Sequence, residues 1–245
     1  MSPTHNPLSL PLSLPPLPLQ ASAQIDAYWS RPLSSFDLHP HGYNTSLAAL
    51  GRQLRRSAKS GARDLFSRAN MFGHLTASAL VLAPDAHGEL HALLVHHKAS
   101  GLWLVPGGHF ERDASLWAAA AREVREETGV TQIKGVPLNQ PWQSNFHALP
   151  DLQQGLDGDS NPPVFDIDTH SIPDNPAKAE KAHLHHDFLF LAMAESTSAL
   201  TPQLEEVHNA RWEPLRALAT HKNRRMQRVM RKFQRLCDMP APVRA

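Results

Sequence analysis

The sequence predicts an α+β domain with helices added at both ends. Residues 76–83 and 90–97 have the composition of strands, and the turn residues Pro-Asp-Ala-His-Gly at 84–88 join them. Residues 115–128 have the spacing of a single helix, which we expect to end at Gly129 because glycine is favoured directly after a helix. Strand segments on both sides of one strong helix indicate a mixed α and β architecture.

The composition excludes several classes of protein. The chain has 245 residues, of which 41% are hydrophobic, and this is enough apolar material for a core. Its apolar runs, such as residues 102–105, are far shorter than the roughly 20 residues of a membrane span, so we expect no membrane association. The single cysteine, Cys237, excludes a disulfide framework and a zinc site made of several thiolates. Because 24 Lys and Arg residues balance 23 Asp and Glu residues, the net charge requires no nucleic-acid partner. We expect a cytoplasmic protein.

Residues 1–24 predict a disordered, proline-rich tail. They contain no Lys, Arg, Asp or Glu, and six of the first eighteen residues are proline, which disfavours helices and central strands. The Ala-Ser-Ala sequence at 21–23 is similar to a signal-peptide cleavage site, but the positive start and the uninterrupted apolar stretch of a signal peptide are missing. Residues 25–71 then predict a helical extension, because leucines recur at i, i+3 and i+7 from Leu47.

The last part of the chain predicts further strands and a basic helix. We expect strands at residues 102–105, 164–168 and 184–192, and a final helix at residues 215–236. The stretch 216–235 contains eight Lys or Arg residues and no acidic residue, and apolar residues recur with helical spacing from Met226 to Phe233. We expect the apolar stripe to pack on the domain and the basic face to be solvated. Contact with nucleic acid or an anionic membrane is the alternative.

Three carboxylates on the predicted central helix suggest a metal site. Glu123, Glu126 and Glu127 are spaced i, i+3, i+4, so they lie on one side of the helix, where their charges repel one another. A bound divalent cation removes this repulsion, and oxygen ligands of this kind suit Mg²⁺ or Mn²⁺ better than zinc or copper. The alternative is a solvated acidic face whose charges pair with Arg122 and Arg125.

The residues around these carboxylates resemble a known family. The sequence Arg-Glu-Val-Arg-Glu-Glu-Thr-Gly-Val at 122–130, which begins fourteen residues after Gly108, is similar to the C-terminal half of the Nudix box, and Pro-Gly-Gly-His at 106–109 extends the resemblance. The resemblance implies an α/β/α sandwich with a mixed sheet over residues 72–218, which leaves residues 219–245 as the basic amphipathic C-terminal segment. It also implies hydrolysis of a nucleoside diphosphate linked to another moiety, with Mg²⁺ or Mn²⁺ as the cofactor.

The resemblance also implies roles for single residues. Glu123, Glu126 and Glu127 match the three family carboxylates that hold the metal, so we expect all three to be catalytic. Arg122 matches the arginine that orients these carboxylates, and we count it among the catalytic residues as well.

Two further features complete the predicted site. The Gly107-Gly108 turn provides a tight backbone bend beside the helix, and we expect both glycines to contact the substrate. A carboxylate must also take a proton from the attacking water, and across this family either a box glutamate or a loop glutamate does so. The loop candidate here is Glu206, for which an ordinary exposed acid is the alternative.

The chain departs from the box at one position. The family has glutamate six residues after Gly108, whereas this chain has Ala114 there and Asp113 one position earlier. We infer that the loop is one residue shorter, and that Asp113 acts both as the N-cap of the helix and as the salt-bridge partner of Arg122.

A second group of polar residues lies in a later predicted strand. Strand alternation places His183, His185 and Asp187 on one face. With Asp-Ile-Asp-Thr-His-Ser-Ile-Pro at 166–173, this segment resembles a bacterial Nudix subgroup that shares both motifs. We predict that the three residues bind substrate through phosphate or base contacts. A second metal site, or polar side chains that satisfy a partly open sheet face, are the alternatives.

These features together predict a metal-dependent pyrophosphohydrolase that acts on a small-molecule nucleotide: a nucleotide sugar, ADP-ribose, a dinucleoside polyphosphate or a nucleoside triphosphate. A non-catalytic Nudix-fold nucleotide-binding module is one alternative, and Ala114 favours it. An RNA-end pyrophosphohydrolase is another, with the basic helix as the track for nucleic acid. A same-fold isomerase of isoprenyl diphosphates is expected to use a cysteine near the sheet, which Cys237 does not provide. A homodimer is compatible with the resemblance, since many family members form dimers.

Overall fold

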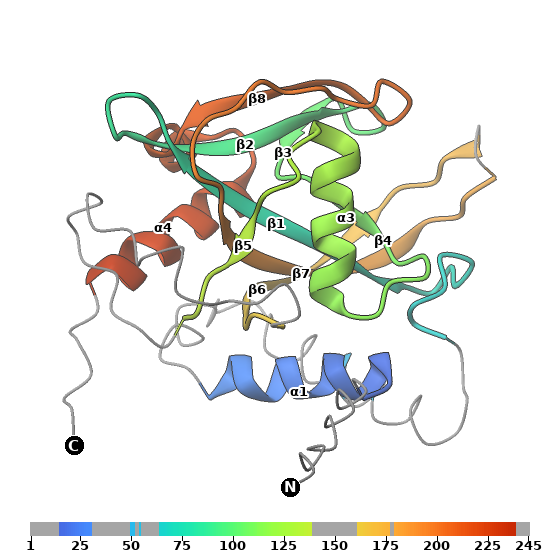
Figure 1. The fold of residues 1–245 in the computed structure, drawn as a ribbon. Helices are drawn as coiled ribbons and strands as arrows, with labels where there is room; N and C mark the ends of the chain where they lie inside the picture. The colour runs from blue at the N-terminus through green and yellow to red at the C-terminus, as the bar shows by residue number, and fades with distance from the viewer. Residues whose placement is uncertain are drawn as a thin grey trace, which may run out of the picture.

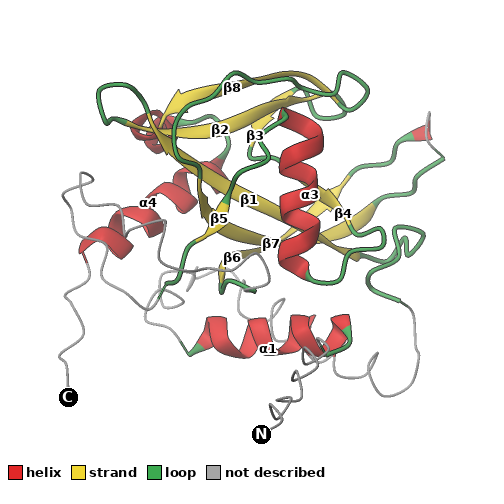
Figure 2. Ribbon diagram, in the orientation of Figure 1, coloured by secondary structure: helices red, strands yellow, loops and turns green. Residues whose placement is uncertain are grey.

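The structure, a computed structural model, describes residues 15–30, 50, 51, 54, 64–138, 161–176 and 179–238. Within these residues, an eight-stranded sheet lies at the centre with helices on both faces (Figures 1 and 2). The strands are β1 (His74–Pro84), β2 (Leu90–His97), β3 (Leu102–Leu104), β4 (Gly107–His109), β5 (Lys134–Gly135), β6 (Val164–Ile172), β7 (His183–Met193) and β8 (Val207–Pro214). The helices are α1 (Leu17–Trp29), α3 (Leu116–Thr128), the 3-10 helix η3 (Leu215–Thr220) and α4 (Arg224–Asp238).

The strand order makes the sheet mixed. The main path runs β3-β2-β1-β7-β5, while β4 pairs with β1, β6 with β7 and β8 with β2. β1 and β7 are parallel over nine residue pairs, and the other pairings are antiparallel. β1 pairs with β4 through residues 76–78 and with β2 through residues 82–84, so β4 and β2 follow one another along the same edge. With helices on both faces, this is the predicted α/β/α sandwich.

Two apolar cores lie on the two faces of the sheet. The odd-numbered residues of β1 from Leu75 to Val81 pack with α1 and α3, whereas Leu80 and Leu82 pack with α4 and η3. Because both faces are covered, β1 is buried along almost its whole length, which explains its nearly continuous apolar sequence. Leu54, whose backbone is helical, joins the α1–α3 core, in agreement with the leucine spacing of the N-terminal extension.

The predicted strands are present, and three further strands, β4, β5 and β8, are added to them. β4 and β5 contain only three and two residues, which is too short to leave a periodic pattern in a sequence. The Gly107-Gly108 pair indicates a turn, but β1 offers Ala77 and Ser78 as partners, and the glycines therefore join the sheet. This pairing places the two glycines directly against α3.

α3 begins and ends as the sequence predicts, but its N-cap is a different residue. The Ser115 hydroxyl accepts a backbone N–H three residues further on at 3.0 Å, so Ser115 caps the helix and the prediction for Asp113 is wrong. The carboxylate oxygens of Asp113 instead accept hydrogen bonds from Arg122, and one of them also accepts the N–H of Glu111 at 3.1 Å. At the other end, Gly129 has a φ of 78°, in the left-handed region that favours glycine after a helix.

α1 begins inside the segment predicted to be disordered. The prediction for residues 1–24 is wrong from Leu17 onwards, because α1 starts there. Pro18 lies in the first helical turn, where a missing N–H costs no intrahelical hydrogen bond and the fixed φ of proline suits the helix. Ile25 and Tyr28 are buried in the same core as α3, so packing holds this helix on the domain.

The predicted final helix is divided into two. His221 has an extended backbone between η3 and α4. The side-chain oxygen of Asn223 then accepts the N–H of Arg225 at 2.8 Å, which favours a new helix start at this point. The apolar stripe from Met226 to Phe233 is buried in the second core, as predicted. None of the helices within the described ranges is long and apolar enough to cross a membrane.

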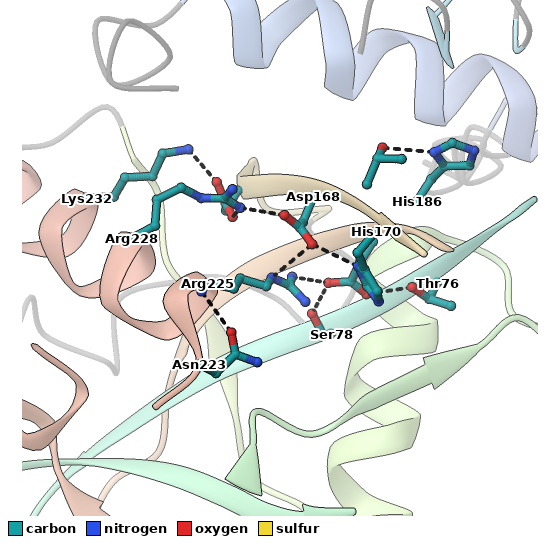
Figure 3. Close-up of polar contacts among 12 residues, drawn as sticks. Thr76, Ser78, Asp168, His170, His186, Asn223, Arg225, Arg228 and Lys232 are labelled. Atoms are coloured by element: carbon teal, nitrogen blue, oxygen red, sulfur yellow. Dashed lines mark hydrogen bonds and ion pairs between the residues drawn. The ribbon is translucent and has the colours of Figure 1, made fainter. Parts of the chain in front are cut away.

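The prediction that the basic face of the last helix is solvated is wrong for part of α4. Three of its cations point toward the sheet and pair with three buried aspartates of β6 and β7 (Figure 3). The residues are Arg225, Arg228 and Lys232 on the helix, and Asp166, Asp168 and Asp187 on the strands. Nucleic acid or a membrane would therefore meet these three cations already paired.

Asp166 lies at the centre of this network. Its side chain is fully buried and pairs with Lys232, and Arg228 donates to it at 2.5 Å. Arg228 also donates to Asp168 at 3.0 Å, so one guanidinium links two aspartates. Burial alone would raise the pKa of Asp166, but the charges of Lys232, Arg228 and Arg225 outweigh it and hold the pKa below its usual value. The network therefore fixes α4 to β6 through full charges.

We predict that Asp166→Asn lowers the free energy of unfolding by about 3–5 kcal/mol, because it leaves buried cations without compensation. Urea unfolding measures this loss. Glu89→Gln is the matched control: Glu89 pairs with Arg216 at the surface, where the two side chains are 40% and 75% exposed, and the loss there should stay below about 1 kcal/mol. Equal losses in the two variants would contradict a stabilising role for the buried network.

Candidate active site

Three carboxylates come together where α3 meets the turn before β8. Glu123 and Glu127 lie on α3, and Glu206 directly precedes β8. Their oxygen atoms lie within 4.8 Å of one another, close enough to surround one ion. The backbone holds Glu206 in place, because its carbonyl accepts the N–H of Lys98 at 3.2 Å just after β2. The loop glutamate expected from the sequence therefore lies beside two of the helix glutamates.

Burial and mutual repulsion make the carboxyl groups of Glu123 and Glu127 hard to ionise. Glu123 and Glu127 are only 5% and 3% exposed. Burial raises the pKa of Glu123 to about 7 despite the opposing charge of Arg122, and raises the pKa of Glu127 to about 8 despite a hydrogen bond from Gly107. The charges of neighbouring glutamates add to both increases. A cation placed among these oxygens would favour the charged forms, so the donor set fits a metal ion.

The two glycines of β4 fit closely against these glutamates. The N–H of Gly107 donates to Glu127 at 2.9 Å. A Cβ atom on Gly108 would lie only 2.5 Å from an oxygen of Glu123, so a side chain at this position would displace the carboxylate. The predicted Gly107-Gly108 bend therefore does lie at the site, and its lack of side chains is what allows α3 to approach β4.

Arg122 connects the parts of the site through five hydrogen bonds. It donates to both oxygens of Asp113 at 3.0 Å each, to the carbonyl of His109 at 2.7 Å, to Glu123 at 3.0 Å and to Glu126 at 2.8 Å. Burial works against the charged form, but the bonds to Asp113 and Glu126 and the surrounding negative charges raise the pKa of Arg122 above its ordinary value. The shortened loop thus supplies the acidic partner that the sequence predicts for this arginine.

Glu126 stands apart from the group of three. Its side chain is 37% exposed and contacts Arg122 at 2.8 Å and Arg125 at 3.8 Å. The sequence groups the three glutamates of α3, whereas the structure groups two of them with Glu206. The difference arises because one oxygen of Glu126 is bonded to the neighbouring guanidinium one helical turn away.

The predicted substrate-binding residues of β7 lie on the other face of the sheet. His183, His185 and Asp187 share a face with Leu189 and Leu191, which pack in the core with α4. α3 and its glutamates are on the opposite face. The structure therefore does not bring these three residues next to Glu123, Glu127 and Glu206.

Asp187 is fully engaged within the protein. Its carboxylate accepts hydrogen bonds from Thr76 at 2.8 Å and Ser78 at 2.5 Å, and it pairs with Arg225 (Figure 3). These contacts tie β7 to β1 and to α4. They support the alternative in which this residue satisfies a polar patch of the sheet.

His183 and His185 belong to a larger group of histidines. The ring centroid of His74 lies 5.0 Å from that of His109 and 4.8 Å from those of His183 and His185, and His170 lies 5.7 Å from His185. Burial lowers the pKa of His109 to about 4 and that of His185 to about 2, so both rings are neutral near pH 7. The sequence analysis missed His74, because its place beside His185 follows from the parallel register of β1 and β7.

Comparison with known proteins identifies the family. A model of the NUDIX domain matches residues 74–235, which extends past residue 218 and includes most of α4. Phosphatase NudJ of Escherichia coli (strain K12) is 42% identical over 60 residues, which are 24% of this chain and 36% of that protein. Phosphatase NudJ of Shigella flexneri gives the same values. The match thus spans only about a third of the length of these relatives.

Solved structures that resemble the chain match about two thirds of it at low sequence identity. An Ap4A hydrolase of C. elegans in a binary complex is 17% identical, with 67% of this chain and 97% of that chain covered and a TM-score of 0.45. The NUDIX domain of Shewanella oneidensis NrtR complexed with ADP ribose is 19% identical, with 66% and 86% covered and a TM-score of 0.41. The assignment therefore depends on the family model. Because that model covers more than half of the chain, the protein belongs to the NUDIX domain family.

Proposed function

We propose that this protein is a pyrophosphohydrolase that depends on Mg²⁺ or Mn²⁺ and cleaves the diphosphate linkage of a nucleoside diphosphate derivative. The observation that carries the proposal is the group of three carboxylates, Glu123, Glu127 and Glu206, beside the Gly107-Gly108 backbone. The resemblance of a 60-residue stretch to a protein named a phosphatase supports phosphate chemistry. The precise nucleotide is left to the experiment below.

The donor atoms of the site select the kind of metal. Glu123, Glu127 and Glu206 offer carboxylate oxygens, which hard divalent cations such as Mg²⁺ and Mn²⁺ prefer. When bound, such an ion supplies positive charge that stabilises the negative charge developing on a phosphoryl group. Glu126 lies one helical turn from Arg122 on α3. Its carboxylate is available to the ion as a fourth ligand if its hydrogen bond with Arg122 opens.

The chain's own residues divide the remaining work. Glu206 is the exposed member of the group, so its carboxylate is the one best placed to take a proton from an attacking water. Glu127 is held by the N–H of Gly107, and Glu123 by the guanidinium of Arg122. Arg122 acts as a positioning residue, because its contacts are with the carboxylates and the β4 backbone.

We expect the hydrolysis to depend on a divalent metal ion. We expect phosphate-containing products from at least one member of a panel of nucleotide sugars, ADP-ribose, dinucleoside polyphosphates and nucleoside triphosphates, with Mg²⁺ or Mn²⁺ present and not with EDTA. Glu127→Gln should lower kcat by about 100-fold or more, because it removes charge from the group that surrounds the ion. Glu195→Gln, an exposed acid after β7, is the matched control and should keep the normal rate.

Two outcomes of this assay would count against the proposal. Cleavage that persists in EDTA would show that no divalent ion is needed. Absence of cleavage with every substrate, combined with retained Mg²⁺ binding in the wild type and loss of that binding in Glu127→Gln, would favour a nucleotide-binding module instead.

Glu206 is the proposed general base. Glu206→Gln should lower kcat by about 10²–10⁴-fold, as expected for loss of a proton acceptor, while circular dichroism and the melting temperature stay close to wild type because the side chain is exposed. Glu205→Gln, the exposed neighbour, is the control. Equal rates for the two variants would remove Glu206 from the reaction and leave a helix glutamate as the base.

Asp113, in the loop before α3, is the acidic partner of Arg122. Asp113→Asn should lower kcat by about 10-fold with little change in KM, because Arg122 loses a charged partner and holds Glu123 less firmly. Asp113→Glu should restore part of the rate, since it returns the charge. Steady-state kinetics of both variants separate this positioning role from a general loss of stability, which would not be rescued in kcat alone.

A further inference from the structure

We propose that His74, His109 and His185 form a binding site for a divalent transition-metal ion such as Zn²⁺, separate from the glutamate site. One ring nitrogen from each histidine lies within 4.8 Å of one from each of the other two. Neutral imidazole nitrogen is a ligand that zinc and related ions prefer, whereas Mg²⁺ prefers oxygen. Three histidines with a remaining open position are an arrangement that zinc accepts.

Strand pairing brings the three ligands together. His74 of β1 lies directly beside His185 of β7 in the parallel register. His109 of β4 is opposite Thr76, and antiparallel partners point to the same face. Alternation along β1 places His74 and Thr76 on one face, which is the face away from α3. Three different strands therefore hold the site, so its geometry is set by the sheet rather than by a loop.

His74 carries an independent sign of a missing ligand. The residue is 1% exposed, and its Nδ1 lies 3.2 Å from the carbonyl oxygen of Asn70. Because a carbonyl only accepts, Nδ1 carries the proton, and Nε2 of the neutral ring has a free lone pair. Nε2 is buried and has no hydrogen-bond partner in the structure. Since an unsatisfied buried polar atom is costly, a metal ion at this position would compensate for it.

Two neighbouring histidines have the same orientation. Nδ1 of His183 lies 2.6 Å from the carbonyl of Lys181 and carries the proton, so Nε2 of His183 accepts a hydrogen bond from Nε2 of His185 at 3.1 Å. Nδ1 of His170 lies 2.8 Å from a carboxylate oxygen of Asp168. A ring nitrogen bonded to a carbonyl or carboxylate fixes the tautomer and directs the other nitrogen outward, as in metal-binding histidines. His183 therefore becomes available as a fourth ligand if its hydrogen bond with His185 opens.

Metal binding by the full chain tests the site without any use of hydrolase activity. The protein is stripped of metal and titrated with Zn²⁺ by calorimetry in excess Mg²⁺, which occupies the glutamates. We expect about one Zn²⁺ per chain. Co²⁺ bound in its place should give the visible absorption of a nitrogen-ligated ion. Absence of zinc binding by the wild-type protein would overturn the proposal and leave a packed cluster of neutral histidines.

Variants assign the binding to the three histidines. His74→Gln and, separately, His185→Gln should weaken Zn²⁺ binding by at least about tenfold and remove the Co²⁺ spectrum, with circular dichroism confirming the fold. His91→Gln is the matched control, because its Nδ1 also lies against a backbone carbonyl, that of Glu89, but outside the cluster. Glu127→Gln should leave zinc binding unchanged. Binding that survives both cluster variants, or that is lost in Glu127→Gln alone, would place the ion elsewhere.

Discussion

The parallel pairing of β1 with β7 is the contact on which the rest of the structure depends. It runs from the pair His74–His185 to the pair Leu82–Met193 and gives the sheet two fully covered faces. β4 attaches to the other edge of β1, where its own antiparallel register places the two glycines against α3. A shift of one residue along the strands would exchange the two faces of β7 and separate both the histidines and the aspartates from their partners.

The pKa values of buried carboxyl groups are shifted in opposite directions on the two faces of the sheet. On the α4 face, fixed cations surround Asp166 and hold its pKa low, so the charge is permanently compensated. On the α3 face, Glu123 pairs with Arg122 and Glu127 accepts the N–H of Gly107, but burial still raises their pKa values to about 7 and about 8. Compensated charges stabilise a fold, whereas uncompensated ones at a crowded position mark a place where an external cation is needed. This contrast supports the proposal that Glu123 and Glu127 belong to a metal site, whereas Asp166 is structural.

Local features could be predicted from the sequence, and long-range ones could not. The spacing of Glu123 and Glu127 and the glycine after α3 both act within about one helical turn, and both are where the sequence indicates. The Gly107-Gly108 pair lies beside the glutamates as expected, but as part of strand β4 and not as a turn. The basic face of α4 was assigned to solvent because the partners of Arg228 lie about 60 residues away in the sequence. The place of His74 in the histidine group could not be predicted for the same reason, since only the register between β1 and β7 puts it beside His185.

Asp113 shows why a single missing glutamate does not disrupt the site. The sequence assigns it two tasks, but its oxygens accept hydrogen bonds from Arg122 and from the N–H of Glu111, and Ser115 is the residue that caps α3. Arg122 in turn has five N–H donors, and each is used once: two on Asp113, one on the β4 backbone and two on glutamates of α3. The bidentate pair anchors the guanidinium. An ion can therefore draw Glu126 away from Arg122 at the cost of one hydrogen bond, while the other four keep the arginine in place.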